Sequence, residues 1–328
     1  MSRVSMVMLA LAASVTIAFS SAHAQTIRLA HHHAVGGTVD KLANKFAELV
    51  DEKTDGRVKV RVFPGAQLGQ EREAYDLVNQ GAVDVSITSP AILETVYPAI
   101  AVTSLPFSFR GWDHARELYK GEFGQKLAEG VRANSNSTIL GYAHLGFRDL
   151  LFVGEAPTTL AEIKGKRMRS PENTVWIRMF ELMGTSPTPV TWGEVYSAMQ
   201  TGIAEGLDSP PATAIDMKFN EVAKSLLKTN HMFGSMVVAI NTPKFEALSA
   251  EDQALVREAA VEAGDWSDLE VAKVEEAGAY DRLSGLGLKI VGPADAQEWR
   301  DAMKPLNDEI AARHPDIPDF IKLMTEEN

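Results

Sequence analysis

Two arginines are the first residues of this sequence whose type and position suggest chemistry. Arg169 lies at the end of a short strand-like segment, residues 166–170, that Pro171 terminates. Ligands are often held at strand ends in α/β proteins, and a guanidinium there can donate two parallel hydrogen bonds to a carboxylate. Arg148, in the sequence Gly-Phe-Arg, is the second candidate. Because the chain is rich in Asp and Glu, a structural ion pair is the alternative role for either arginine.

Three consecutive histidines, His31, His32 and His33, follow a predicted strand at residues 26–30. Neutral imidazoles bind metals well, so a metal site is one hypothesis. Neighbouring side chains of an extended chain point to opposite faces, however, so the three rings cannot easily meet one ion. A histidine that donates a hydrogen bond to a ligand is the second hypothesis. Solvated loop positions are the third for His31 and His33.

Trp192 lies within Thr191-Trp192-Gly193-Glu194, which has the spacing of a helix capping box. The pattern predicts that the tryptophan stands at the start of a helix. There it can fill a core or form an aromatic wall beside a ligand.

Motifs of the well-marked enzyme classes are missing from the chain. The sequence has no G-x-x-x-x-G-K-[ST] loop, no G-x-S-x-G elbow, no H-E-x-x-H pair and no cysteine. The lack of cysteine excludes disulfides and thiolate chemistry. We therefore expect a protein that is not an enzyme and needs no cofactor. A secreted hydrolase with an unmarked acid/base pair is an alternative that no motif supports.

The composition is that of an acidic globular protein. The 328 residues carry a formal charge of −12, and 45% are hydrophobic. A largely disordered chain is excluded by these values. An acidic chain without a basic tract is a poor nucleic-acid binder, because phosphate contacts need clustered Lys and Arg.

The N-terminus predicts export. Arg3 precedes a 16-residue uncharged run that ends at Phe19, and Ala22-His23-Ala24 fits a signal-peptidase site. A membrane anchor is the alternative, but the run is short for a span of about 20 residues. We expect residues 1–24 to be a signal peptide and the mature protein to be soluble in the periplasm.

The elements that would position these side chains alternate between strands and helices. A Ser-Pro helix start follows a predicted strand twice, at Ser89 and at Ser209, 120 residues apart. The repetition suggests two related α/β lobes. Helical spacing over residues 249–284 would make a helix of about 50 Å, long enough to bridge both lobes. Gly264 and Gly278 could bend that helix.

Several sequence segments, in this order, resemble the solute-binding proteins of tripartite ATP-independent periplasmic (TRAP) transporters, of the C4-dicarboxylate-binding, DctP-type family. The resemblance covers nearly the whole mature chain. Its clearest segments are FPGAQLG (63–69), QGAVD (80–84), SLPF (104–107), KGKRMRSP (164–171) and GEVYSAMQTG (193–202).

The resemblance implies a two-lobed α/β periplasmic binding protein that closes around a small organic acid. Arg169 takes the place of the arginine that clamps the ligand carboxylate in most relatives, and Arg148 takes that of an assisting arginine. Trp192 would lie along the ligand, and His32 would be a polar contact. The Ser-Pro starts would bring Ser89 and Ser209 to the cleft from opposite lobes.

One segment departs from the family pattern. Many relatives have G-x-E-N-P where this chain has Gly-Leu-Asp-Ser-Pro, so Ser209 replaces an asparagine and Asp208 adds a carboxylate. We expect Asp208 and Glu172 to lie near the clamp and to accept a hydroxyl or a positive group of the ligand.

The resulting prediction is a receptor that delivers a small organic acid to membrane permease subunits, with a monomer as the family expectation. Lobe I is predicted to comprise residues 25–145 and 235–270, and lobe II residues 146–234 and 271–328, with the long helix between them. The alternative function is a metal-binding receptor that uses the histidine run.

Overall fold

The computed structural model describes residues 25–326. The predicted signal peptide lies outside the described residues. Within residues 25–326, no helix is both long and apolar enough to cross a membrane.

One mixed sheet runs through the molecule. Its strands follow the order β2-β1-β3-β8-β4-β7-β5-β6, and β9 pairs with β8. The pairs β1/β2, β1/β3, β5/β6, β5/β7 and β8/β9 are parallel, and β8 is antiparallel to both β3 and β4. The strands are β1 (Gln25–His31), β2 (Val58–Phe63), β3 (Val85–Thr88), β4 (Ser137–Phe152), β5 (Arg167–Ser170), β6 (Ser186–Pro189), β7 (Gly206–Ser209), β8 (Ser225–Asn241) and β9 (Lys289–Val291).

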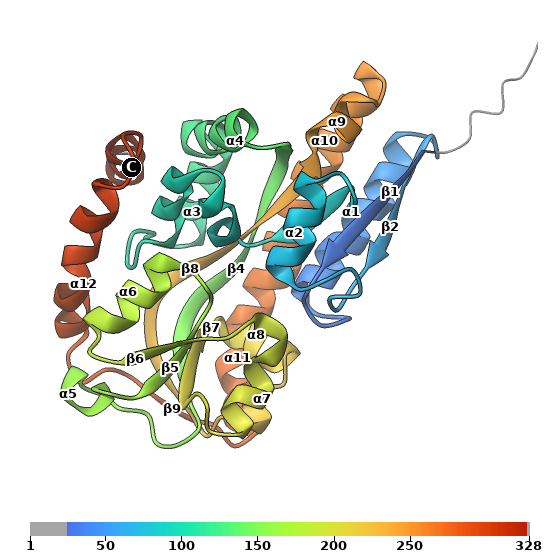
Figure 1. Ribbon diagram of the computed structural model, residues 1–328. Helices are drawn as coiled ribbons and strands as arrows, with labels where there is room; N and C mark the ends of the chain where they lie inside the picture. The colour runs from blue at the N-terminus through green and yellow to red at the C-terminus, as the bar shows by residue number, and fades with distance from the viewer. Residues whose placement is uncertain (1–24, 327–328) are drawn as a thin grey trace, which may run out of the picture.

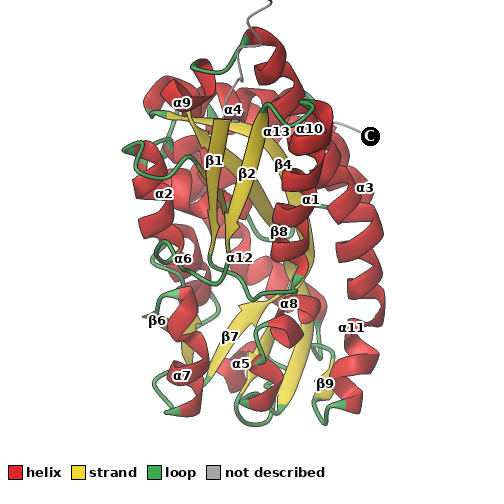
Figure 2. Ribbon diagram, turned by 90° about the vertical axis from the view of Figure 1, so that its right-hand side faces the viewer, coloured by secondary structure: helices red, strands yellow, loops and turns green. Residues whose placement is uncertain are grey.

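Helices cover both faces of this sheet (Figure 2). The α-helices are α1 (Thr38–Lys53), α2 (Glu71–Asn79), α3 (Trp112–Lys120), α4 (Glu122–Asn134), α5 (Leu160–Ile163), α6 (Thr174–Leu182), α7 (Val195–Gln200), α8 (Pro211–Asp216), α9 (Thr242–Glu246), α10 (Ala250–Trp266), α11 (Lys273–Gly285), α12 (Ala296–Ala311) and α13 (Ile317–Glu326). Short 3₁₀ segments are η1 (Pro90–Thr95), η2 (Pro98–Ser104), η3 (Trp192–Glu194) and η4 (Phe219–Glu221), and η5 (Ser267–Ala272) is π-helical.

The strands form two groups joined by β4 and β8. Figure 1 shows β1 and β2 beside one end of this pair and β5, β6 and β7 beside the other. The two long strands pair along nearly their full length, from Ser137 opposite Asn241 to Phe152 opposite Ser225. The α/β class predicted from the sequence is therefore confirmed.

Local patterning explains the first elements. Val39, Leu42, Phe46 and Val50 recur at helical spacing, and all four are buried on one face of α1. That face packs against α10 and β2. Valines alternate with Lys59 and Arg61 over the next strand, β2, as expected for a strand with one solvent-exposed face.

The predicted long helix is present as α10, η5 and α11, which follow one another without a break from residue 250 to residue 285. Figure 2 shows α10 beside the upper strands and α11 beside the lower ones. The helix departs from α-helical geometry at the π-helical turn η5, whereas Gly264 and Gly278 lie within the α-helical parts α10 and α11. A Cβ at Gly264 would lie 2.2 Å from the carbonyl oxygen of Tyr142, so glycine permits the helix to approach β4 closely.

Two sets of hydrogen bonds connect the elements beside one end of the β4/β8 pair with those beside the other end. On one side, the Thr38 amide of α1 donates to Asp216 of α8 at 3.1 Å, and the Thr38 hydroxyl donates to Glu275 of α11 at 3.0 Å. On the other side, the side-chain amide of Asn173 donates to the carboxylate of Glu94 in η1 at 2.6 Å.

The predicted lobe boundaries stay a prediction. The last helix, α13, belongs by those boundaries to lobe II, yet it packs against η2 and α4, which lie in the range given to lobe I. The C-terminal segment therefore crosses from one end of the molecule to the other.

Candidate ligand cleft

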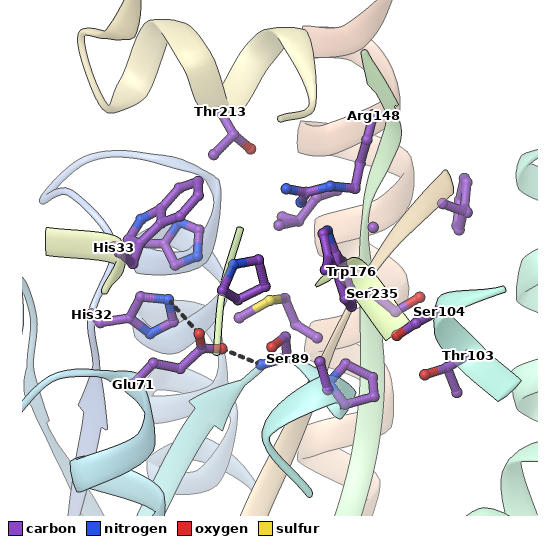
Figure 3. A pocket seen from close by; sticks show the side chains of 18 of the residues that line it. His32, His33, Glu71, Ser89, Thr103, Ser104, Arg148, Trp176, Thr213 and Ser235 are labelled. Carbon is purple, nitrogen blue, oxygen red and sulfur yellow. Dashed lines mark hydrogen bonds and ion pairs between the residues drawn. The ribbon is translucent and has the colours of Figure 1, made fainter. Parts of the chain in front are cut away.

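A cleft of about 670 Å³, counted out to its open mouth, lies where β4 and β8 pass between the two groups of strands. The pairing of β4 with β8 shifts in register just before Gly146, whose φ is +89°, and again just after Arg148. Such irregularities re-aim side chains. The lining residues are His32, His33, Glu71, Ser89, Pro90, Ala91, Thr103, Ser104, Leu145, Arg148, Arg169, Pro171, Trp176, Trp192, Thr213, Phe233, Gly234, Ser235 and Met236 (Figure 3).

Arg169 on β5 is buried, with 3% of its surface exposed. Its Nε donates to the carbonyl of Val190 at 2.9 Å, and its guanidinium carbon lies 5.3 Å from the centre of the Trp192 ring. Within residues 25–326, its two terminal nitrogens donate no hydrogen bond to the protein. Burial lowers the pKa of Arg169 to about 10, so the side chain stays charged at neutral pH. A buried cation with free donors is suited to bind an anion.

Arg148 on β4 lines the cleft, and its guanidinium is bonded to Asp208 on β7, which does not line the cleft. Its Nε donates to the Asp208 carboxylate, and its Nη2 donates to the Asp208 carbonyl at 2.7 Å. The indole of Trp176 donates to the same carboxylate at 3.1 Å. Burial alone would raise the pKa of Asp208, but Arg148 and His231 outweigh burial and hold that pKa well below its usual range. Asp208 is thus an ionised positioning residue for Arg148.

His32 and Glu71 form the opposite wall of the cleft from Arg148 (Figure 3). Glu71 accepts hydrogen bonds from the Ser89 amide at 2.7 Å and the Thr88 hydroxyl at 3.1 Å. Burial opposes the ionisation of Glu71, but these hydrogen bonds stabilise the ionised carboxylate, and the pKa of Glu71 is lowered. Burial, aided by Arg169, lowers the pKa of His32 although Glu71 acts in the opposite direction. The wall therefore presents a carboxylate and a neutral imidazole at neutral pH.

Trp192 serves both roles that the sequence left open. It lines the cleft, with 9% of its surface exposed, and its ring centre lies 5.3 Å from that of Phe219 in the core. The predicted capping box is absent, since the Thr191 hydroxyl donates to the Glu194 carboxylate at 2.9 Å and caps no backbone amide. Trp192 still starts a helical segment, η3.

Each of the three histidines has a different partner, although the rings of His32 and His33 lie 4.5 Å apart and both line the cleft. His31 contacts Asp40, with 3.0 Å between Nε2 and Oδ1, and His32 faces Glu71. His33 lies against Trp192, with ring centres 5.5 Å apart. The described residues contain no group of three or more His, Asp or Glu side chains that could hold a metal ion. The metal hypothesis is therefore without support from the geometry.

The structure brings five of the eight predicted site residues to the cleft. These five are His32, Ser89, Arg148, Arg169 and Trp192. The other three do not line the cleft. Asp208 lies behind Arg148, Ser209 is fully buried with its hydroxyl donating to the Pro210 carbonyl at 3.1 Å, and Glu172 is exposed. Strand β7 is buried on both faces, which is why its two polar residues lie inside the protein.

Several lining residues were not identified from the sequence. Glu71 is the most consequential, because it places a negative charge in the cleft. Trp176 shares helical spacing with Met179 and Phe180, which by itself predicts only a buried helix face, and its indole nitrogen bonds to Asp208. Ser104 stands within one of the family segments quoted above, which was the one available signal for it. The remaining hydroxyl residues, Thr103, Thr213 and Ser235, carried no recognisable pattern.

Comparison with known proteins identifies the family. Residues 29–314 match the family model described as "Bacterial extracellular solute-binding protein, family 7", DctP. The chain belongs to this family. The predicted TRAP solute-binding family and two-lobed fold are confirmed, and members of the family are solute-binding receptors, not enzymes.

Three similar proteins indicate the range of the family. The sialic acid-binding periplasmic protein SiaP of Vibrio cholerae is 28% identical over 284 residues, which is 86% of this chain and 87% of SiaP. The 2,3-diketo-L-gulonate-binding periplasmic protein YiaO of Escherichia coli is 27% identical over 308 residues, 94% of this chain and 93% of YiaO. A TRAP periplasmic solute-binding protein from Roseobacter denitrificans, crystallised with β-D-glucuronate, superposes with a TM-score of 0.88 at 26% identity, covering 93% of this chain and 100% of that one.

Proposed function

We propose that this chain is the periplasmic receptor of a TRAP transporter for a sugar acid, which it binds in the cleft and delivers to a membrane permease. The observation that carries the proposal is the buried guanidinium of Arg169, whose terminal nitrogens have no protein partner within residues 25–326. The three similar proteins support the ligand class, since their names or bound ligands are sialic acid, 2,3-diketo-L-gulonate and β-D-glucuronate.

In this proposal the ligand carboxylate binds Arg169 through two parallel hydrogen bonds, and Arg148 provides further donors. Trp192 forms the apolar wall beside it. The hydroxyl groups of the sugar acid face the polar side chains of the cleft, which are His32, Glu71, Ser89, Thr103, Ser104, Thr213 and Ser235.

The mechanism is a shift of population. Ser89 and His32 lie in the range predicted for lobe I, whereas Arg169 and Trp192 lie in that predicted for lobe II. A ligand that contacts both sides binds the closed form more tightly than the open form, so it increases the closed population. The permease would then recognise the closed receptor. We expect residues 1–24 to direct export, and one chain to suffice, because the cleft is complete within it.

The test is isothermal titration calorimetry on the chain from Gln25. The panel contains gluconate, galactonate, glucuronate and galacturonate, with glucose and galactose as uncharged controls. We expect at least one acid to bind and both neutral sugars to fail. Arg169→Ala should abolish binding, because the ligand carboxylate loses the guanidinium that donates hydrogen bonds to it.

A matched control is available on the same strand. Arg167→Ala removes an arginine whose side chain is 50% exposed and pairs with Glu205 outside the cleft, so affinity should stay within about twofold. Unchanged affinity in the Arg169 variant would refute the clamp. Equal binding of acids and neutral sugars by the wild type would refute the receptor function.

A further inference from the structure

Glu71 is an unexpected group in a cleft that binds an acid. Of the described residues that line the cleft, it is the one carboxylate. It stands in the first turn of α2, where the helix dipole favours a negative charge. Its position is fixed, since Oε1 accepts from both the Ser89 amide and the Thr88 hydroxyl.

The second oxygen of Glu71 has acceptor capacity left. Oε2 lies 3.6 Å from Nε2 of His32, which is longer than a normal hydrogen bond. An ionised carboxylate accepts about four hydrogen bonds and donates none. A ligand atom beside Oε2 must therefore be a donor, such as a hydroxyl.

The charges of the cleft leave room for one ligand carboxylate. Arg148 and Arg169 contribute two positive charges, and Asp208 and Glu71 contribute two negative charges. Arg148 is already bonded to Asp208, and Arg169 has free terminal donors. A first carboxylate is stabilised by Arg169. A second carboxylate would find no third cation among the residues that line the cleft, and it would add to the negative charge of Glu71.

We propose that Glu71 is a specificity-determining residue that restricts the cleft to sugar acids with a single carboxylate and selects a ligand hydroxyl beside its Oε2. This inference rests on the proposed function as an acid receptor. Two like charges about 6 Å apart at an effective dielectric of 20 repel enough to weaken binding roughly 100-fold.

Matched ligand pairs test the proposal. Gluconate and glucarate differ only at C6, which is a hydroxymethyl group in the first and a carboxylate in the second, and galactonate and galactarate form the same pair. Calorimetry on the wild type should show a preference of roughly 100-fold for the monoacid. Glu71→Gln keeps an oxygen acceptor for Ser89 and Thr88 but removes the charge, so the preference should fall to less than about tenfold. Glu172→Gln, which removes an exposed charge outside the cleft, should leave the preference unchanged.

A second ligand keeps the test decisive if the Glu71 variant does not fold. The 6-amide of glucarate has nearly the bulk of the diacid and an N–H donor for Oε2, without the second charge, so it should bind the wild type much more tightly than glucarate. An amide as weak as glucarate would attribute the selectivity to size and overturn the role of Glu71. Equal binding of monoacids and diacids would also overturn it while leaving the receptor function intact. Failure of every acid to bind would instead refute the receptor function.

Discussion

Replacing Asp208 with Asn should destabilise the protein by leaving the charge of Arg148 uncompensated. Asn retains the shape of Asp and an oxygen for the indole of Trp176, which lies 3.1 Å from the carboxylate. Asp208 is fully buried, and the Arg148 side chain is 11% exposed. Removing one partner of a buried pair costs about 3–5 kcal/mol.

The expected shift in melting temperature follows from the size of the chain. An unfolding entropy of about 2.1 cal/mol/K per residue gives roughly 0.6 kcal/mol/K for a chain of about 300 residues. A loss of about 3–5 kcal/mol then lowers Tm by roughly 5–8 °C. Differential scanning calorimetry of the ligand-free protein measures this shift directly.

A double-mutant cycle separates the pair from other effects. In an Arg148→Met background the guanidinium is gone, so Asp208→Asn should cost clearly less than in the wild type. The pKa of Asp208 is depressed in the folded state, so its contribution is present above the unfolded value of about 3.9 and is lost as pH falls further. The Tm difference between wild type and variant should therefore shrink below about pH 4. A Tm change under 1 °C at neutral pH, or equal costs in both backgrounds, would refute the reasoning.

Three further predictions concern helix packing, closure and pH. Gly264→Ala should lower Tm by several degrees because its Cβ would meet the β4 backbone, whereas Gly278→Ala, with nothing within 4 Å, should not; equal Tm values would contradict this. The Thr38 amide of α1 donates to Asp216 of α8, and we expect this bond between the two lobes to stabilise the closed form. Asp216→Ala should therefore lower ligand affinity in calorimetry about fivefold, the equivalent of one hydrogen bond, with Tm nearly unchanged. The lowered pKa of His32 keeps it neutral, so affinity should be constant between about pH 6.5 and 8; a step there that His32→Asn abolishes would show the imidazole to be charged.

The elements that can be predicted from the sequence are those with one solvent-exposed face and one buried face. Helix α1 and strand β2 are predictable because polar and apolar residues recur in them with the period of a helix or a strand. The long strands β4 and β8 were not identified, since nearly all their residues are buried and neither strand alternates. The two central strands of the fold thus lack the alternation of polar and apolar residues from which a peripheral strand such as β2 can be predicted.

Part of the site was predictable from the family resemblance, and part was not. Arg169, Arg148 and Trp192 line the cleft, and their contact with a ligand stays a prediction. Glu71 was overlooked because an acidic residue at a helix start usually faces solvent. Asp208 was placed among the ligand contacts, but its side chain is taken up by Arg148, a pairing across β4 and β7 that no local pattern encodes.

The order of the strands in the sheet delays assembly of the fold. Strand β3 must pair with β8, more than 130 residues further along the chain, before β1–β3 are joined to the rest of the sheet. Contacts of such long sequence separation form slowly, because a large loop must close first. A nascent chain that ends before residue 241 therefore has no completed β4/β8 pair on which to fold. If the chain is exported as we propose, this late step lengthens the time during which it can be threaded unfolded through a narrow translocation channel.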